Sequence, residues 1–109
     1  MANFNSTLGL RAEGDSIVLD TRPEHEVIPG MVHFAVLTTI AEVSAAHAVN
    51  EPVVPSTVTV HLMRPAKAGT LTGKGTILKR GKRITTAEGE VTQDGKLVAK
   101  ATISFAMMG

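Results

Sequence analysis

The 109-residue sequence contains no cysteine, tryptophan or tyrosine, and phenylalanine occurs only three times. Without cysteine the chain can form no disulfide, no thiolate nucleophile and no cysteine-ligated metal site. The scarcity of aromatic rings argues against single-stranded nucleic-acid binding, which relies on base stacking on such rings. The net charge is only +1, so the chain as a whole is not attracted to polyanions. We therefore expect no nucleic-acid partner.

Targeting and membrane signals are also missing. The N-terminus, MANFNSTLGLRAEGD, lacks the basic start and the apolar run of a signal peptide. One long apolar segment raises the question of a membrane span, but it contains Glu42, His33 and His47, which are unfavourable inside a bilayer. We expect a cytoplasmic protein that forms a single domain over residues 1–109 and has no membrane partner.

That apolar segment, residues 27–50 (VIPGMVHFAVLTTIAEVSAAHAVN), is the most informative part of the chain. Pro29–Gly30 near its start, and Asn50 followed by Pro52 at its end, are typical of helix boundaries. Its residues are apolar almost all the way round, which predicts a helix enclosed by the rest of the protein. Glu42 is its only formally charged residue. Because a carboxylate is costly to bury unless it is paired, protonated or functional, Glu42 is the leading candidate site residue.

The remaining segments have the alternation and the turns of antiparallel strands. Two short strands are expected within residues 8–22, and four more over residues 56–62, 69–79, 83–93 and 96–107. Small residues on one face of the strand over 83–93, with Gly73 and Gly75 nearby, indicate a surface that something approaches closely. We predict an α+β fold, in which a curved antiparallel β-sheet wraps a long central helix and a second subunit helps to cover it.

The order and spacing of these elements resemble the hot-dog-fold thioesterases, specifically the PaaI-like acyl-CoA thioesterase group. Gly30 and His33 reproduce the family's Gly-x-x-His step, and Glu42 stands nine residues after His33, where the family has Asp or Glu inside its helix. His25 stands where the family's loop His falls. Further matches to the family's Arg-Pro-Ala strand end, basic turn and final hairpin lie at Leu62 to Gly69, Lys79 to Arg83 and Asp94 to Ala99.

The resemblance covers residues 8–105 and implies the hot-dog fold and hydrolysis of a small, medium-chain or aromatic acyl-CoA. It implies that Glu42 is the general base or nucleophile, that the Phe34 N–H is the oxyanion donor and that His33 is a positioning group. Substrate contacts are expected from the loop His25 and from cations that would dock the CoA phosphates, namely Lys79, Arg80 and Arg83 of the basic turn, with Arg64 and Lys67 as further candidates.

Two positions depart from the family pattern. Val27 replaces the loop Asn, and His33–Phe34–Ala35 replaces His-Gly-Gly. Valine cannot orient a water or a carbonyl, and Phe34 obstructs the close backbone approach that glycine permits. An alternative is therefore a non-catalytic hot-dog protein that binds acyl-CoA or another small apolar ligand. A hot-dog dehydratase fits less well, because no Asp-x₄-His pattern precedes the helix.

The spacing of His33 and Glu42 constrains the site. Nine helical steps place the two side chains on opposite faces, so they cannot share a site within one regular helix. Either His33 lies outside the regular helix, or Glu42 of one subunit meets the helix start of another. The resemblance implies the second arrangement and thus a homodimer, or a homotetramer built as a dimer of dimers, with the site at the dimer interface.

Structural roles remain alternatives for these residues. Glu42 would then bond to Thr38 or Thr39 one turn earlier, and His33 would bond to the backbone. No His-x-His or His-x₃-His spacing occurs, so we expect no metal ion and no cofactor.

Overall fold

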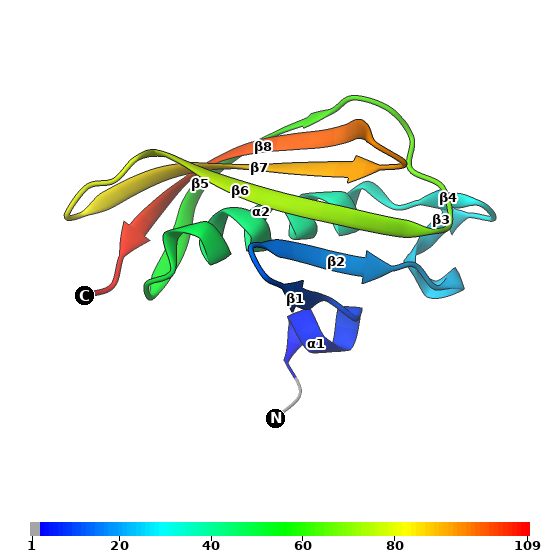
Figure 1. The fold of residues 1–109 in the computed structure, drawn as a ribbon, viewed down its shortest axis with the longest axis horizontal. Helices are drawn as coiled ribbons and strands as arrows, with labels where there is room; N and C mark the ends of the chain where they lie inside the picture. The colour runs from blue at the N-terminus through cyan, green and yellow to red at the C-terminus, as the bar shows by residue number, and fades with distance from the viewer. Residues whose placement is uncertain (1–2) are drawn as a thin grey trace.

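A six-stranded antiparallel sheet curls around one long helix in the computed structural model of the protein, which describes residues 3–109 (Figure 1). The helix is α2 (Phe34–Val49). The strands lie in the order β1-β2-β6-β7-β8-β5, with bounds β1 (Arg11–Glu13), β2 (Ser16–Asp20), β5 (Val53–Leu62), β6 (Thr70–Lys79), β7 (Ile84–Gln93) and β8 (Lys96–Met107). The predicted α+β architecture, including the β6-β7-β8 meander, is confirmed.

Several short elements were not expected from the sequence. They are the helix α1 (Phe4–Leu8), the 3₁₀ turn η1 (Pro23–His25) and a two-stranded ribbon of β3 (Glu26–Ile28) and β4 (Met31–Val32). Local signals for α1 were present, because Asn3 accepts a hydrogen bond from the Ser6 N–H at 2.9 Å and Gly9 adopts the left-handed conformation at its end.

The central helix begins later than the Pro29–Gly30 signal indicates. Gly30 has a φ of 86° and forms the turn of the β3–β4 ribbon, where the Glu26 carboxylate accepts the Gly30 N–H at 2.7 Å. The chain reaches helical geometry only at Phe34. The other end follows the prediction, since Asn50 is left-handed, with a φ of 56°, and donates its N–H to the Ala46 carbonyl.

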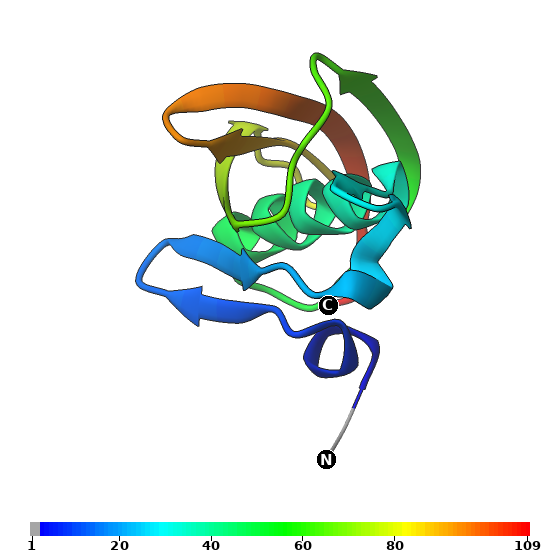
Figure 2. The same ribbon diagram turned by 90° about the vertical axis from the view of Figure 1, so that its right-hand side faces the viewer.

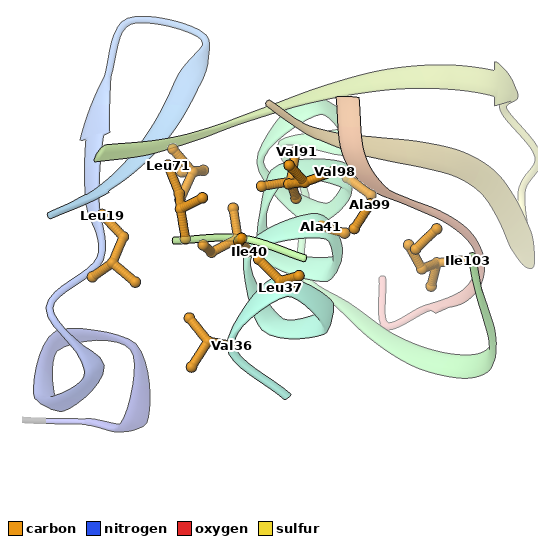
Figure 3. Packing of buried hydrophobic residues seen from close by; sticks show 14 of the residues in the cluster. Leu19, Val36, Leu37, Ile40, Ala41, Leu71, Val91, Val98, Ala99 and Ile103 are labelled. Atoms are coloured by element: carbon orange, nitrogen blue, oxygen red, sulfur yellow. The ribbon is translucent and has the colours of Figure 1, made fainter. Parts of the chain in front are cut away.

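The core fills the space between α2 and the concave face of the sheet. Figure 3 shows Leu37, Ile40 and Ala41 of the helix pointing toward side chains from the strands, including Leu71 and Val91. Glycines of β6 and β7 allow the close approach that the sequence indicates. A Cβ at Gly89 would overlap the Ala41 carbonyl, and one at Gly75 would overlap the Ser44 carbonyl. The helix backbone is what approaches this small-residue surface.

One side of the core is open. Figure 2, an end-on view, shows the sheet curving round the helix, with β5 at one edge of the sheet. Val58 and Leu62 of β5 pair with the buried Ile103 and Ala99 and share their inward face. Nevertheless, Val58 is 42% exposed and Leu62 is 52% exposed. Over residues 3–109, no helix has the length and apolarity needed to cross a membrane.

The glycine contacts give a stability prediction. Replacing Gly89 with Ala forces the new Cβ against the helix backbone, which has no rotamer to change, and we expect the free energy of unfolding to fall by about 2 kcal/mol or more. Urea unfolding at one fixed protein concentration measures this. Thr76→Ala, on the opposite face of β6, is the control, and equal stability of the two variants would contradict the close packing.

Candidate active site

The start of α2 is capped by the side chain of His33. His33 is the N-cap residue, with extended backbone angles (φ −64°, ψ 139°), and its Nδ1 accepts the Ala35 N–H at 2.9 Å. Its own N–H donates to the His25 carbonyl. His33 thus lies outside the regular helix, as one of the two sequence-based alternatives requires. Since Nδ1 is an acceptor, the neutral ring carries its proton on Nε2, which is left for another partner.

This cap leaves one N–H open at the helix start. The Ala35 N–H is taken by His33 Nδ1, and the Val36 N–H donates to the His33 carbonyl at 3.0 Å. The Phe34 N–H, which precedes both, has no hydrogen-bond partner in the described part of the chain. An unpaired N–H at the positive end of a helix dipole suits a developing oxyanion. The Phe34 ring stacks on the His33 ring, with centroids 4.7 Å apart, and is 57% exposed.

The helix start borders an apolar groove of about 520 Å³. Three segments form it: the β3–β4 ribbon, the first turns of α2 that follow this ribbon, and, distant in sequence, the end of β5 with the loop after it. Its lining side chains are almost all apolar, and they include Met31, Phe34, Leu37 and Met63. Arg64 is the cation at its rim. Val27 also lines the groove, so the position of the family's loop Asn is occupied here by an apolar side chain.

Glu42 lies further along α2, on the flank that faces β5. Ile40 lies over Gly73 of β6, and the Ala41 backbone lies over Gly89 of β7. A further helical step of about 100° turns Glu42 toward the β8–β5 side. The side chain is half-buried.

The Glu42 carboxylate has no compensating partner within residues 3–109. Thr38 and Thr39, the partners expected if Glu42 had a structural role, instead donate their hydroxyls to the carbonyls of Phe34 and Ala35 at 3.0 and 2.8 Å. Burial alone raises the pKa of Glu42, with no hydrogen bond or opposite charge in the described chain to offset it. A raised pKa makes the carboxylate a stronger base and so a better proton acceptor.

Within one chain Glu42 and the Phe34 N–H are separated. The eight helical steps from Phe34 to Glu42 span roughly 12 Å of helix axis, so one substrate carbonyl cannot meet both groups. A complete site from these residues needs two chains.

The loop histidine of the sequence prediction is buried. His25 is 3% exposed, its Nδ1 accepts the Arg22 N–H at 2.9 Å, and its Nε2 donates to the Leu8 carbonyl at 2.8 Å. Both ring nitrogens are therefore engaged within the chain. With these two hydrogen bonds, His25 fixes the loop that precedes the helix. Its buried position does not support the substrate contact expected from the sequence.

The predicted basic residues fall into two separate places. Lys79 ends β6, and Arg80 and Arg83 lie in the β6–β7 turn at the C-terminal end of α2. There Arg80 binds the Glu51 carboxylate at 2.6 Å and the Val49 carbonyl at 3.1 Å. This end is roughly 24 Å along the helix from Phe34. Arg64 instead borders the groove at the helix start.

The remaining histidines have other positions. His47 bonds to the Gly14 carbonyl at 2.9 Å and so ties α2 to the β1–β2 turn, whereas His61 is exposed on β5. In the described residues, no three His, Asp or Glu side chains are grouped in a way that could hold a metal ion.

This arrangement, a long helix wrapped by a curved antiparallel sheet, is the hot-dog fold, and the chain has the features of its PaaI-like thioesterases. The chain belongs to the acyl-CoA thioesterase family, because the family model described as "Acyl-CoA thioesterase N-terminal domain" matches residues 23–106. The comparison with curated proteins found no match.

Solved structures support the same fold. A mutant of the phenylacetic acid degradation protein PaaI from Thermus thermophilus is 26% identical, with a TM-score of 0.86 over 96% of this chain and 98% of that one. The TT0310 protein of the same organism is 26% identical, with a TM-score of 0.87 over 99% of this chain and 100% of that one. BH2602 from Bacillus halodurans, solved with CoA, is 24% identical, with a TM-score of 0.88 over 99% of this chain and 78% of that one. This likeness is one of fold.

The environment of Glu42 gives a pH-dependent stability prediction. Because its pKa is raised above 4.5, the folded state holds the proton more tightly than the unfolded state, and folding must bury a bare carboxylate once the pH passes the raised pKa. The Glu42 contribution to stability is thus fully present below pH 4.5 and is lost as the pH rises. We expect Glu42→Gln to melt at a higher temperature than the wild type at about pH 7.5, with the difference shrinking toward about pH 4.5. A difference that is the same at both pH values would contradict this account.

Proposed function

We propose that the protein is an acyl-CoA thioesterase whose active site is completed across a homodimer interface. Membership of the family supports thioester hydrolysis in general. The observation that carries the specific proposal is the half-buried Glu42, which has a raised pKa, has no partner within residues 3–109 and faces the open flank of the helix.

In the proposed reaction, the thioester carbonyl oxygen accepts a hydrogen bond from the Phe34 N–H at the positive end of α2. The Glu42 carboxylate of the other protomer removes a proton from water, which attacks the carbonyl carbon, or attacks that carbon itself. Collapse of the tetrahedral intermediate breaks the carbon–sulfur bond and releases the CoA thiolate. After attack by water, the acid is the product and the proton held by Glu42 passes to the thiolate; after direct attack, water hydrolyses the anhydride formed with Glu42, which frees the acid and the carboxylate and supplies the proton to the thiolate. His33 holds the first turn of the helix and so aims the Phe34 N–H.

The edge strand supports a dimer. β5 has ten residues and hydrogen-bonds on one side to β8, while its other side is the edge of the sheet. Long exposed edges of this kind are usually covered or paired. Pairing two copies through β5 would bury the exposed Val58 and Leu62 and bring the open flank of each helix toward the other chain. The acyl chain would then lie along this flank. The same dimer is the building block of the alternative homotetramer.

The groove also favours a second candidate function, the binding of an acyl-CoA or another apolar ligand without hydrolysis. Val27 lines the groove where a polar loop residue is expected, and the stacked rings of Phe34 and His33 lie at the helix start. Binding without turnover is the result that would favour this candidate.

Thiol release, measured with DTNB over short, medium, long and aromatic acyl-CoAs, tests the proposal. We expect the wild type to release CoA and Glu42→Gln, which keeps the shape of the side chain, to lower kcat at least about a hundredfold. Glu90→Gln, on the outer face of β7, is the matched control and should retain activity. A folded Glu42→Gln protein with wild-type kcat would exclude the proposed role. CoA esters that raise the melting temperature without any thiol release would establish the binding protein instead.

A further inference from the structure

The open flank of α2 carries three residues at four-residue spacing, Phe34, Thr38 and Glu42. Four helical steps turn the side-chain direction by about 40° and advance it by about 6 Å along the axis. Thr38 therefore lies midway between Phe34 and Glu42, both along the helix and around it. None of the three is enclosed by its own chain, since Phe34 is exposed and both Thr38 and Glu42 are half-buried. A partner that contacts both Phe34 and Glu42 must lie over Thr38.

The proposed two-chain site fixes how a second helix lies on this flank. In a dimer with two-fold symmetry, if Phe34 of one chain faces Glu42 of the other, the reciprocal contact forms as well. The two contacts are roughly 12 Å apart on each helix, so the helices must run nearly antiparallel. The residue halfway between the two contacts is number 38 in both chains. The two-fold axis therefore passes between the two copies of Thr38.

The edge strand β5 leads to the same orientation of the helices. The chain reverses direction between α2 and β5, which are joined by the short connection from Asn50 to Pro52 (Figure 1). If two β5 edges pair about a two-fold axis and both helices stay on one face of the joined sheet, the strands run antiparallel, because a parallel pair related by such an axis would put the helices on opposite faces. Antiparallel β5 strands bring antiparallel α2 helices with them.

The side chains on the flank disfavour other registers. Glu42 is the only acidic residue of α2, and a two-fold axis at Glu42 would place two half-buried carboxylates against each other. An axis at Phe34 would move Glu42 away from the Phe34 N–H of the other chain. Thr38 is uncharged, and its hydroxyl already donates to the Phe34 carbonyl at 3.0 Å. Two copies of Thr38 can therefore meet without leaving a donor unpaired between them.

We propose that the two Thr38 side chains meet at the two-fold axis of the dimer, one helical turn from each of its two active sites. This inference rests on the proposed function. The interface that completes the sites is then centred on Thr38, and the occupant of the open flank is a second copy of this chain in one defined register.

Disulfide formation between chains tests this register, because the sequence has no cysteine of its own. Phe34→Cys, Thr38→Cys and Glu42→Cys proteins are each equilibrated in a glutathione redox buffer, and covalent dimers are measured on non-reducing gels. We expect Thr38→Cys to form them with an effective thiol concentration at least about tenfold above those of the other two, whose thiols are roughly 12 Å from their own copies along the axis. Mixed Phe34→Cys and Glu42→Cys chains should link to each other more readily than either links to itself.

Thr39→Cys is the matched control. Thr39 is also half-buried and makes the same type of hydroxyl-to-carbonyl hydrogen bond, at 2.8 Å to Ala35, but it points about 100° away from Thr38 around the helix. Equal linking of Thr38→Cys and Thr39→Cys would overturn the inference, as would a maximum at residue 34 or 42 or the absence of a link at residue 38.

The linking result is independent of catalysis. If the wild type releases thiol from acyl-CoA but Thr38→Cys does not link, the proposed function stands and this register is wrong. If Thr38→Cys links selectively but the wild type hydrolyses no thioester, the register stands and the proposed function fails.

Discussion

The close packing of the α2 backbone on the glycines of the sheet fixes the position of the helix, and with it the flank on which Glu42 lies. Because Gly73, Gly75 and Gly89 have no side chains, the helix lies directly on β6 and β7. Side chains at these positions would push the helix away from the sheet. In this position the helix covers β6 and β7 and leaves the inward face of β5 exposed. The open flank, on which Glu42 lies, is thus a consequence of where the sheet admits the helix.

In that position the charged Glu42 carboxylate lowers the stability of the isolated chain, and it is available for the proposed active site. Its pKa is raised by burial, and neither of the neighbouring threonines relieves it. Proteins tolerate such groups mainly where function requires them. The second feature of the proposed site lies at the N-terminus of the same helix. There the His33 side chain accepts the Ala35 N–H and leaves the Phe34 N–H unpaired within the described residues. A carboxylate of raised pKa and an unpaired N–H on one helix, too far apart to reach one substrate carbonyl, fit the proposed two-chain site.

The fold could be predicted well from the sequence because its signals are local. Alternation specifies strands, Gly and Asn mark turns, and the apolar segment requires enclosure. The short α1 and the β3–β4 ribbon were missed because elements of two to five residues leave little periodicity. The site was predicted less completely, since contacts distant in sequence decide it. His25 is engaged by Leu8 and Arg80 by Glu51, neither of which a local pattern reveals. The groove likewise exists only where three segments meet.

Complementation between two inactive variants tests the shared site most directly. Glu42→Gln removes the proposed base, and Phe34→Pro removes the open N–H. Proline is tolerated at the first position of a helix, and the ψ of 139° at His33 suits a residue before proline. Random mixing of the two chains places one complete site in each mixed dimer, so we predict recovery to about a quarter of wild-type activity. Mixed dimers demonstrated by native mass spectrometry that show no more activity than either variant alone would contradict the account.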